Sequence, residues 1–390
     1  MSGLRTLLTV LCLATLALVG CSGDLTSPWE VKEPRLILAR VEIDGDTEAR
    51  ARPRVGDTFH VRVYLASNTK IAAISFAGAL CLSAKLPTGD LACVLELPLD
   101  NLDVQYDGGD SVLLSAPAFA VPQELVAAAA IFGDLGGVSL FSAACIDGTA
   151  ERISGTDAAK DSVRKLFRCT ENAASAHPAP LLSTYTIPFD LDQAGQLNHR
   201  PSFDCSEESG PCAEGVAGTP GEGIPGAFVL EHNEKDAEEP RAVLWEPIPE
   251  DFDVEAEDCS GQPALPLAYA GDEYRIRVRF DAADRETYTA VITDNFGTTE
   301  VERREDLVLS EAFTTHGGGS LDSFSTLIDR DVSDDAAEAE ITYSPPAKIK
   351  DNENAITESG RVVKFFFAVR DGRGGVDFAT RALCVMPPRP

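Results

Sequence analysis

Residues 55–65 read Val55-Gly-Asp-Thr-Phe-His-Val-Arg-Val-Tyr-Leu65, and residues 270–280 repeat the pattern as Ala270-Gly-Asp-Glu-Tyr-Arg-Ile-Arg-Val-Arg-Phe280. Each stretch has Gly-Asp, one further residue, and then apolar side chains at every second position. This alternation is typical of a strand with one buried face, and Gly-Asp supplies the preceding turn. We therefore expect one half-buried antiparallel strand in each copy.

The alternation also assigns a face to each side chain of the two strands. The apolar set, which we expect in the core, is Phe59, Val61, Val63 and Leu65, then Tyr274, Ile276, Val278 and Phe280. The opposite set, which we expect in water, contains His60, Arg62, Arg275, Arg277 and Arg279. Because the copies begin 215 positions apart, at residues 55 and 270, we expect two related modules.

A second alternating segment predicts a hairpin at the C-terminal end. Its apolar positions are Val363, Phe365, Phe367 and Val369, and Phe366 breaks the polarity of the intervening set. Residues 371–375, Asp-Gly-Arg-Gly-Gly, tolerate the positive φ of a tight turn. The returning strand is expected to place Val376, Phe378, Ala382 and Cys384 on one core-facing side.

Short strands separated by turn signals, with few helical patterns, predict an all-β fold of two tandem antiparallel sandwiches. Two stretches of the first module are expected to be minor helical insertions. Residues 122–131 begin with a proline, and Gly133 follows them. Residues 156–169 place Ala159, Val163, Leu166 and Phe167 on one helical face.

Composition sets the class of protein. The 390 residues carry 63 Asp and Glu against 33 Lys and Arg, a net charge of −30. So acidic a chain is not expected to bind nucleic acid, because phosphate binding needs a positive surface. A hydrophobic content of 44% excludes a wholly disordered chain, and the length suits two domains.

The N-terminus predicts export. Residues 1–20 carry Arg5 and then an apolar run over residues 7–20, too short to span a bilayer but suited to a signal peptide. Residues 18–21, Leu-Val-Gly-Cys, resemble the bacterial lipobox. The resemblance implies that Cys21 is acylated, for example with palmitate, and anchors the chain to a membrane through a tether of residues 21–34. By the same analogy Ser22 favours the outer membrane; an ordinary signal peptide with a chance cysteine is the alternative.

Eight cysteines remain after Cys12 leaves with the signal and Cys21 takes the lipid. They are Cys81, Cys93, Cys145, Cys169, Cys205, Cys212, Cys259 and Cys384. An even number in an exported chain predicts disulfides, reduced thiols being the weaker alternative. Proximity favours Cys81–Cys93, Cys145–Cys169 and Cys205–Cys212, which leaves Cys259 with Cys384.

Two short motifs carry a family resemblance. Residues 197–201, Leu-Asn-His-Arg-Pro, resemble the Asn-x-x-Pro entry of bacterial cadherin-like and immunoglobulin-like repeats. Residues 369–377, Val-Arg-Asp-Gly-Arg-Gly-Gly-Val-Asp, resemble the hairpin that closes many such repeats. The resemblance implies a Gram-negative lipoprotein with tandem immunoglobulin-like modules over residues 35–197 and 198–390. Residues 201–226, rich in Gly and Pro, are expected to form a loop of the second module.

Motifs that carry chemistry are few. Residues 221–226 match GxGxxG, but no strand pattern precedes them and Pro225 would disrupt a helix start, so we interpret them as linker. No signature of a metalloprotease, serine hydrolase or P-loop occurs, and we expect no catalytic residue and no cofactor. His177, His199, His232 and His316 lie in stretches expected to be solvated loops.

Carboxylates are abundant and include several close groups. They are Asp107 and Asp110; Asp284 and Glu286; Asp329, Asp331, Asp334 and Asp335; Asp351 and Glu353; and Asp371 and Asp377. Loop acids of this kind can bind calcium, but no complete ligand set occurs, so we expect solvated loops and no metal.

These observations predict a non-enzymatic, lipid-anchored protein of the bacterial cell envelope, on the periplasmic face or the cell surface. It would act as a binding, adhesion or scaffold module for an envelope protein or a surface polymer. The alternative is an envelope hydrolase that uses loop carboxylates or a loop-bound metal ion.

Overall fold

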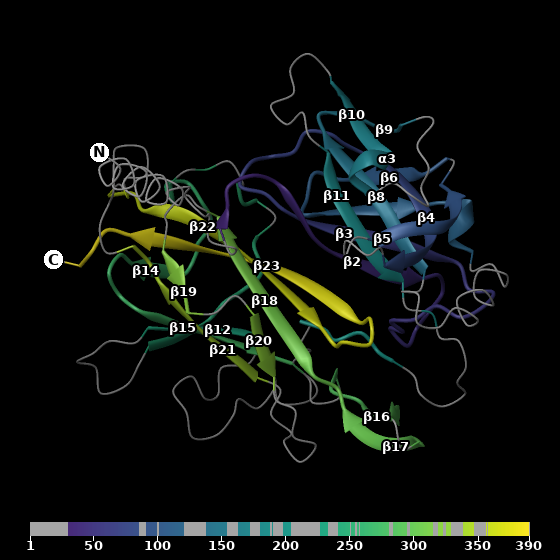
Figure 1. Ribbon diagram of the computed structural model, residues 1–390. Coiled ribbons are helices and arrows are strands. Elements are labelled where there is room, and N and C mark those ends of the chain that lie inside the picture. The colour runs from purple at the N-terminus through teal and green to yellow at the C-terminus, as the bar shows by residue number, and fades with distance from the viewer. Residues whose placement is uncertain are drawn as a thin grey trace, which may run out of the picture.

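The computed structural model describes residues 30–85, 91–99, 101–120, 138–153, 163–171, 180–187, 189, 198–203, 227–232, 241–249, 251–253, 256, 258–280, 284–294, 297–314, 319–322, 325–328, 338–346, 356 and 358–389. These residues form mostly β-strands in antiparallel sheets, with almost no helix, so the expected all-β class is confirmed. Figure 1 shows two groups of strands, one drawn in purple to teal and the other mainly in green to yellow. No helix of this described part is long and apolar enough to cross a membrane.

The first half of the chain builds two sheets around one core. Its strands are β2 (Arg35–Ile43), β3 (Phe59–Ala66), β4 (Ile74–Lys85), β5 (Leu91–Pro98), β6 (Asp103–Tyr106), β7 (Ser111–Ser115), β8 (Val138–Ile146) and β11 (Leu181–Ile187). Among the described residues one sheet has the order β2-β3-β7-β6 and the other β11-β8-β4-β5. A single hydrophobic cluster takes Val61 from β3, Leu80 from β4 and Leu140 from β8, so it joins both sheets.

A small ribbon lies beside the second of these sheets. It pairs β9 (Gly148–Arg152) with β10 (Phe167–Glu171), and the short helix α3 (Val163–Leu166) directly precedes β10; η1 (Pro117–Phe119) is a separate 3₁₀ turn. The helix expected over residues 156–169 is therefore wrong at its end, because Phe167 starts a strand. Phe167 is buried beside the Cys81–Cys93 pair. Residues 122–131 and 154–162 lie outside the described part.

The second half also builds two sheets. Its strands are β12 (Phe228–His232), β13 (Arg241–Leu244), β14 (Leu267–Tyr269), β15 (Tyr274–Arg279), β16 (Thr287–Asp294), β17 (Gly297–Arg304), β18 (Leu307–Thr314), β19 (Ser320–Leu321), β20 (Ser325–Ile328), β21 (Glu338–Ser344), β22 (Arg361–Arg370) and β23 (Val376–Met386). One sheet has the order β13-β12-β15-β21-β19. The other contains β18-β22-β23-β14, with β20 also on β18. β16 and β17 form a separate antiparallel ribbon.

The repeated stretches occupy corresponding places in the two halves. β3 and β15 carry them, and all eight apolar side chains predicted for the core are buried. Each strand has a neighbour on both sides, β2 and β7 for β3, and β12 and β21 for β15. A central strand with one face in the hydrophobic core explains the alternation of apolar and polar side chains that both copies show.

The expected wet face of β15 is wrong for two of its arginines. Arg277 and Arg279 are each only 2% exposed. The neighbouring strands place acids opposite them, since Arg277 pairs with Glu340 and Arg279 with Glu338 in the β21 register. Nε of Arg279 lies 3.0 Å from Oε2 of Glu338. Cross-strand ion pairs therefore cover this face, which a single strand's pattern does not reveal.

The C-terminal hairpin forms as predicted, but the returning strand faces the other way. β22 pairs with β23 in antiparallel register. Leu383 and Val385 of β23 enter the core of the second half. Val376 and Phe378, expected in that core, instead pack against the first half, as does Phe366. The break in polarity at Phe366 thus reflects a second buried surface between the halves.

Three of the four expected disulfides form, two between cysteines close in the chain and one between the pair that remained. They are Cys81–Cys93, Cys145–Cys169 and Cys259–Cys384, separated by 12, 24 and 125 positions. None of the three connects one half to the other. The pair expected between Cys205 and Cys212 lies outside the described residues.

The chain enters the fold before its first long strand. β1 (Glu30–Val31) pairs in parallel with β18 of the second half, and Val31 is fully buried. Residues 30 and 31 were expected to belong to the tether of residues 21–34; they instead add a strand to the sheet of the second half. Figure 1 shows this purple segment beside β18 and β22 before the chain crosses to β2.

Candidate binding groove

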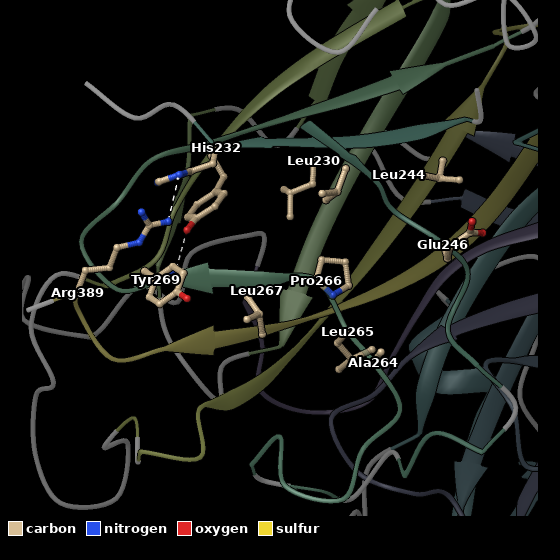
Figure 2. A pocket seen from close by; sticks show the side chains of 12 residues that line it. Leu230, His232, Leu244, Glu246, Ala264, Leu265, Pro266, Leu267, Tyr269 and Arg389 are labelled. Atoms are coloured by element: carbon tan, nitrogen blue, oxygen red, sulfur yellow. Dashed lines mark hydrogen bonds between the residues drawn. The ribbon is translucent and has the colours of Figure 1, made fainter. Parts of the chain in front are cut away.

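A groove opens between the two sheets of the second half, at the side where β13 and β14 lie. β13 ends one sheet and β14 ends the other, within the part of the chain that the structure describes. The space between them has a volume of about 650 Å³. Figure 2 shows its lining side chains, most of which come from β12, β13, β14 and the segment before β14.

Most of the groove is apolar. Leu230 of β12 lies at its inner side and is 2% exposed. Leu244, Leu265 and Pro266 add further apolar surface. Two residues on its rim stand out in exposure, Val243 at 46% and Leu267 at 51%.

One end of the groove is polar. His232 Nε2 lies 2.8 Å from Oδ2 of Asp272, and Nη2 of Arg389 lies 3.3 Å from His232 Nδ1. With Nε2 as the donor to the carboxylate, Nδ1 can accept from the guanidinium. The Arg389 guanidinium also stacks over the Tyr269 ring, 4.3 Å from its centroid. Figure 2 shows His232, Tyr269 and Arg389 grouped at this end.

The side chain of Tyr274 supports the polar end of the groove through two contacts. The His232 ring stacks on that of Tyr274, with centroids 4.8 Å apart. The Tyr274 hydroxyl accepts a 2.7 Å hydrogen bond from the backbone N–H of Tyr269. Burial raises the pKa of Tyr274 to about 12, so its hydroxyl stays neutral at physiological pH. This contact fixes β14 relative to β15.

The lining of the groove combines apolar side chains with a few polar groups. Its described lining residues include no Ser, Thr or Cys and one carboxylate, Glu246. An apolar space with a few fixed polar groups at one end is typical of a binding site.

Sequence reasoning placed His232 in a solvated loop, and this is wrong. His232 ends β12 and is 8% exposed, because Tyr274 and Asp272 enclose it. The groove was also missed as a whole. Its one sequence signal is the apolar run Ala264-Leu-Pro-Leu-Ala-Tyr269, whose proline is compatible with an edge strand.

The carboxylates singled out by sequence lie away from the groove. Asp107 and Asp110 flank a turn of the first half, between β6 and β7. Asp371 and Asp377 lie in and beside the turn of the C-terminal hairpin, where Asp371 is buried and bonds to Asn198, and Asp377 pairs with Arg40 of β2. Asp284 accepts a hydrogen bond from the backbone of Ser202.

Glu286, beside Asp284, accepts a hydrogen bond from the backbone N–H of His199. The other acids and the lipidation residue predicted from the sequence lie outside the described part. They are Cys21, Asp329, Asp331, Asp334, Asp335, Asp351 and Glu353. Among the described residues, no group of three or more His, Cys, Asp or Glu side chains is arranged to hold a metal ion.

No family model matches this chain, and no curated protein is significantly similar to it.

Proposed function

We propose that this protein is a non-catalytic binding module of the bacterial cell envelope, and that the groove receives an extended peptide segment of a partner envelope protein. The acylated Cys21 would hold the chain at the outer membrane, an inference supported by the lipobox-like residues 18–21.

The observation that carries the proposal is the exposure of apolar side chains on two open sheet edges. The large hydrophobic side chains that are exposed among the described residues are Val55, Leu95, Val243, Leu267 and Val301. Two of these five, Val243 and Leu267, line the same groove. Exposed apolar surface around a pocket marks an interaction site.

The backbone of β14 favours a peptide over a small molecule. Pro266 O accepts from Cys384 N, and Ala270 N donates to Met386 O, both toward β23. Because alternate residues of a strand direct their backbone groups to opposite sides, the N–H and C=O of Leu267 point away from β23. An extended segment could bond there and place an apolar side chain in the groove, which is a common mode of peptide recognition.

Strand order supports an immunoglobulin-like sandwich for each half. With β2, β3, β7 and β6 taken as strands A, B, E and D, the other sheet supplies G, F, C and C′ as β11, β8, β4 and β5. This is the immunoglobulin arrangement with one added strand. In the second half, β15, β21 and β19 correspond to B, E and D, and β18, β22 and β23 to C, F and G. Such folds commonly serve as surface modules, but they specify no ligand.

The test places a photocrosslinking residue at Leu267 in the full chain on intact cells. The control carries it at Val55, which is equally exposed, at 50%. We expect an adduct with one envelope protein at position 267 and not at position 55, with the crosslink in one short segment of that partner.

A binding measurement with the purified partner and purified variants of this protein then tests the role of the groove. The partner should bind wild-type protein and bind Leu267→Asp at least about tenfold more weakly, since one polar group at an apolar contact costs a kcal/mol or more. Val55→Asp should bind normally. Identical adducts at both positions, or an adduct between two copies of this chain, would contradict the proposed partner.

A further inference from the structure

A second hollow lies between the two halves of the chain, apart from the groove. Its volume is about 480 Å³. The first half contributes residues of the segment 67–71 and the turn 107–110, and the second half contributes the segment 248–253. Lys364 of β22 and Thr380 of β23 complete its lining. We call this space the inter-half cleft.

The turn 107–110 is held rigidly at the cleft. Gly108 has a φ of +91°, which glycine adopts readily. The backbone N–H of Gly109 donates to Oδ1 of Asp107 over 3.1 Å. The backbone oxygen of Asp110 accepts from Leu65 N over 2.8 Å, which ties the turn to β3. The carboxylates of Asp107 and Asp110 are therefore presented by a fixed backbone.

An ion pair joins the two halves at the cleft. Nζ of Lys364 lies 3.3 Å from Oδ1 of Asp110. The lysine is 5% exposed, and its ammonium lies 5.3 Å from the centroid of the Phe366 ring. Phe366 belongs to the buried surface between the halves, so the lysine of this ion pair is held beside that surface.

The charges that line the cleft are mixed and close to balanced, which favours a neutral ligand over a highly charged one. Three carboxylates, Asp107, Asp110 and Asp253, face two ammonium groups, Lys70 and Lys364. A polyanion would meet the three acids, and a metal ion or polyamine would meet the two lysines. The mixture suits a ligand that is neutral and carries many hydroxyl groups, since carboxylates accept from hydroxyls and ammonium groups donate to them.

The remaining lining residues include aromatic rings and hydroxyl groups, which also suit a ligand of this kind. Tyr106 and Phe252 supply two aromatic rings, which can pack against the C–H face of a sugar. Ser67, Thr69 and Thr380 supply hydroxyl groups. The Tyr106 hydroxyl donates to Ile71 O over 3.2 Å, so its ring is fixed in place.

We infer that the inter-half cleft binds a neutral saccharide, independently of the peptide groove. Hydroxyl groups of the sugar bond to Asp107 and Asp110, and its apolar face packs on Phe252. The ligand contacts both halves at once, so binding depends on their observed arrangement.

The experiment titrates the full chain with an array of neutral oligosaccharides and measures saturable binding by calorimetry. At least one is expected to bind. Asp107→Asn and Phe252→Ala should each weaken it at least about tenfold, the loss expected for one charge-assisted hydrogen bond or one stacking contact.

Two control variants show whether a loss of saccharide binding is specific to the cleft residues. Asp103→Asn changes an exposed acid of the neighbouring strand β6 and should bind as the wild type does. Leu267→Asp, which blocks the groove, should also leave saccharide binding unchanged. Melting curves show that each variant is folded. The inference is overturned if no neutral saccharide binds, or if a folded Asp107→Asn and a folded Phe252→Ala both bind normally.

Discussion

Asn198 and Asp371, 173 positions apart, are joined by a hydrogen bond of 3.2 Å from Nδ2 of the amide to Oδ2 of the carboxylate. Asn198 belongs to the Asn-x-x-Pro motif, and Asp371 opens the turn of the C-terminal hairpin. Oδ1 of Asp371 accepts from the backbone N–H groups of Arg373 and Gly375. A Cβ on Gly375 would collide with the Asp371 carboxylate, so this turn requires glycine there. The two motifs of the family resemblance therefore meet in one buried polar cluster.

That cluster continues into the contact between the halves. Arg40 of β2 donates to Oδ1 of Asp377 over 2.6 Å, and Phe203 N donates to Oδ2 over 2.9 Å. Burial raises the pKa of Asp377, against the hydrogen bonds and cations that favour its charged form. Breaking such a contact leaves a buried charge without its partner, which is strongly destabilising.

We predict that Asn198→Ala lowers the free energy of unfolding by about 1–3 kcal/mol, because it removes a donor from a buried carboxylate. The matched control is Asn101→Gly, at an exposed site with a φ of 60° that glycine adopts without strain. Urea unfolding measures both. Equal stability of the two variants would show that the Asn198 contact contributes nothing.

A second prediction concerns pH and the buried Glu305. Burial, together with Asp371, raises its pKa to about 8, although Arg373 lies 2.7 Å from Oε1. The folded state therefore keeps a proton that the unfolded state loses near pH 4.5. Stability contributed by this group should fall as pH rises from about 4.5 to about 8.

Glu305→Gln should remove that part of the pH dependence, so its stability relative to the wild type should rise between pH 5 and pH 8. Glu300→Gln, at an exposed site, should follow the wild-type curve. Chemical unfolding at several pH values tests this. Parallel curves for the wild type and Glu305→Gln would mean that the carboxyl is ionised throughout.

The disulfides give a third prediction. Replacing Cys259 and Cys384 with Ala opens a loop of 125 residues, worth about 5 kcal/mol in the chain-entropy model. Replacing Cys81 and Cys93 opens a loop of 12 residues, worth about 3 kcal/mol. In urea unfolding, the fluorescence of the buried Trp245 should report the loss of stability caused by removing Cys259–Cys384. The critical result is that removal of Cys259–Cys384 lowers stability more than removal of Cys81–Cys93. The reverse order would rule out the chain-entropy model for these disulfides.

Calcium should not affect folding, because the sequence holds no complete set of calcium ligands. We expect the same melting temperature in millimolar calcium and in excess chelator. A rise of many degrees with calcium, reversed by chelation, would identify the loop acids as a site.

The lipid anchor is tested by metabolic labelling with a palmitate analogue. The wild type should be labelled and Cys21→Ala should not, because the lipobox-like sequence offers that thiol for acylation. Cys12→Ala is the control and should be labelled normally. Label that persists on Cys21→Ala would disprove the anchor.

The sequence by itself determined that two repeated stretches form strands and which of their apolar side chains enter the core. Phe59 to Leu65 and Tyr274 to Phe280 alternate because a pleated strand turns successive side chains to opposite faces, a local property. Proximity along the chain also favoured the Cys81–Cys93 and Cys145–Cys169 pairs, which the structure contains, because cysteines close in sequence have the shortest loops to close.

Only the tertiary structure decided what covers the second face of each strand. Arg277 and Arg279 have the pattern of exposed residues, yet neighbouring strands enclose them with acids. Phe366 and Val376 are buried because the two halves pack together, and the groove exists because β13 and β14 both end their sheets. These features depend on contacts between residues far apart in the chain, whereas periodicity reports only the alternation within one strand.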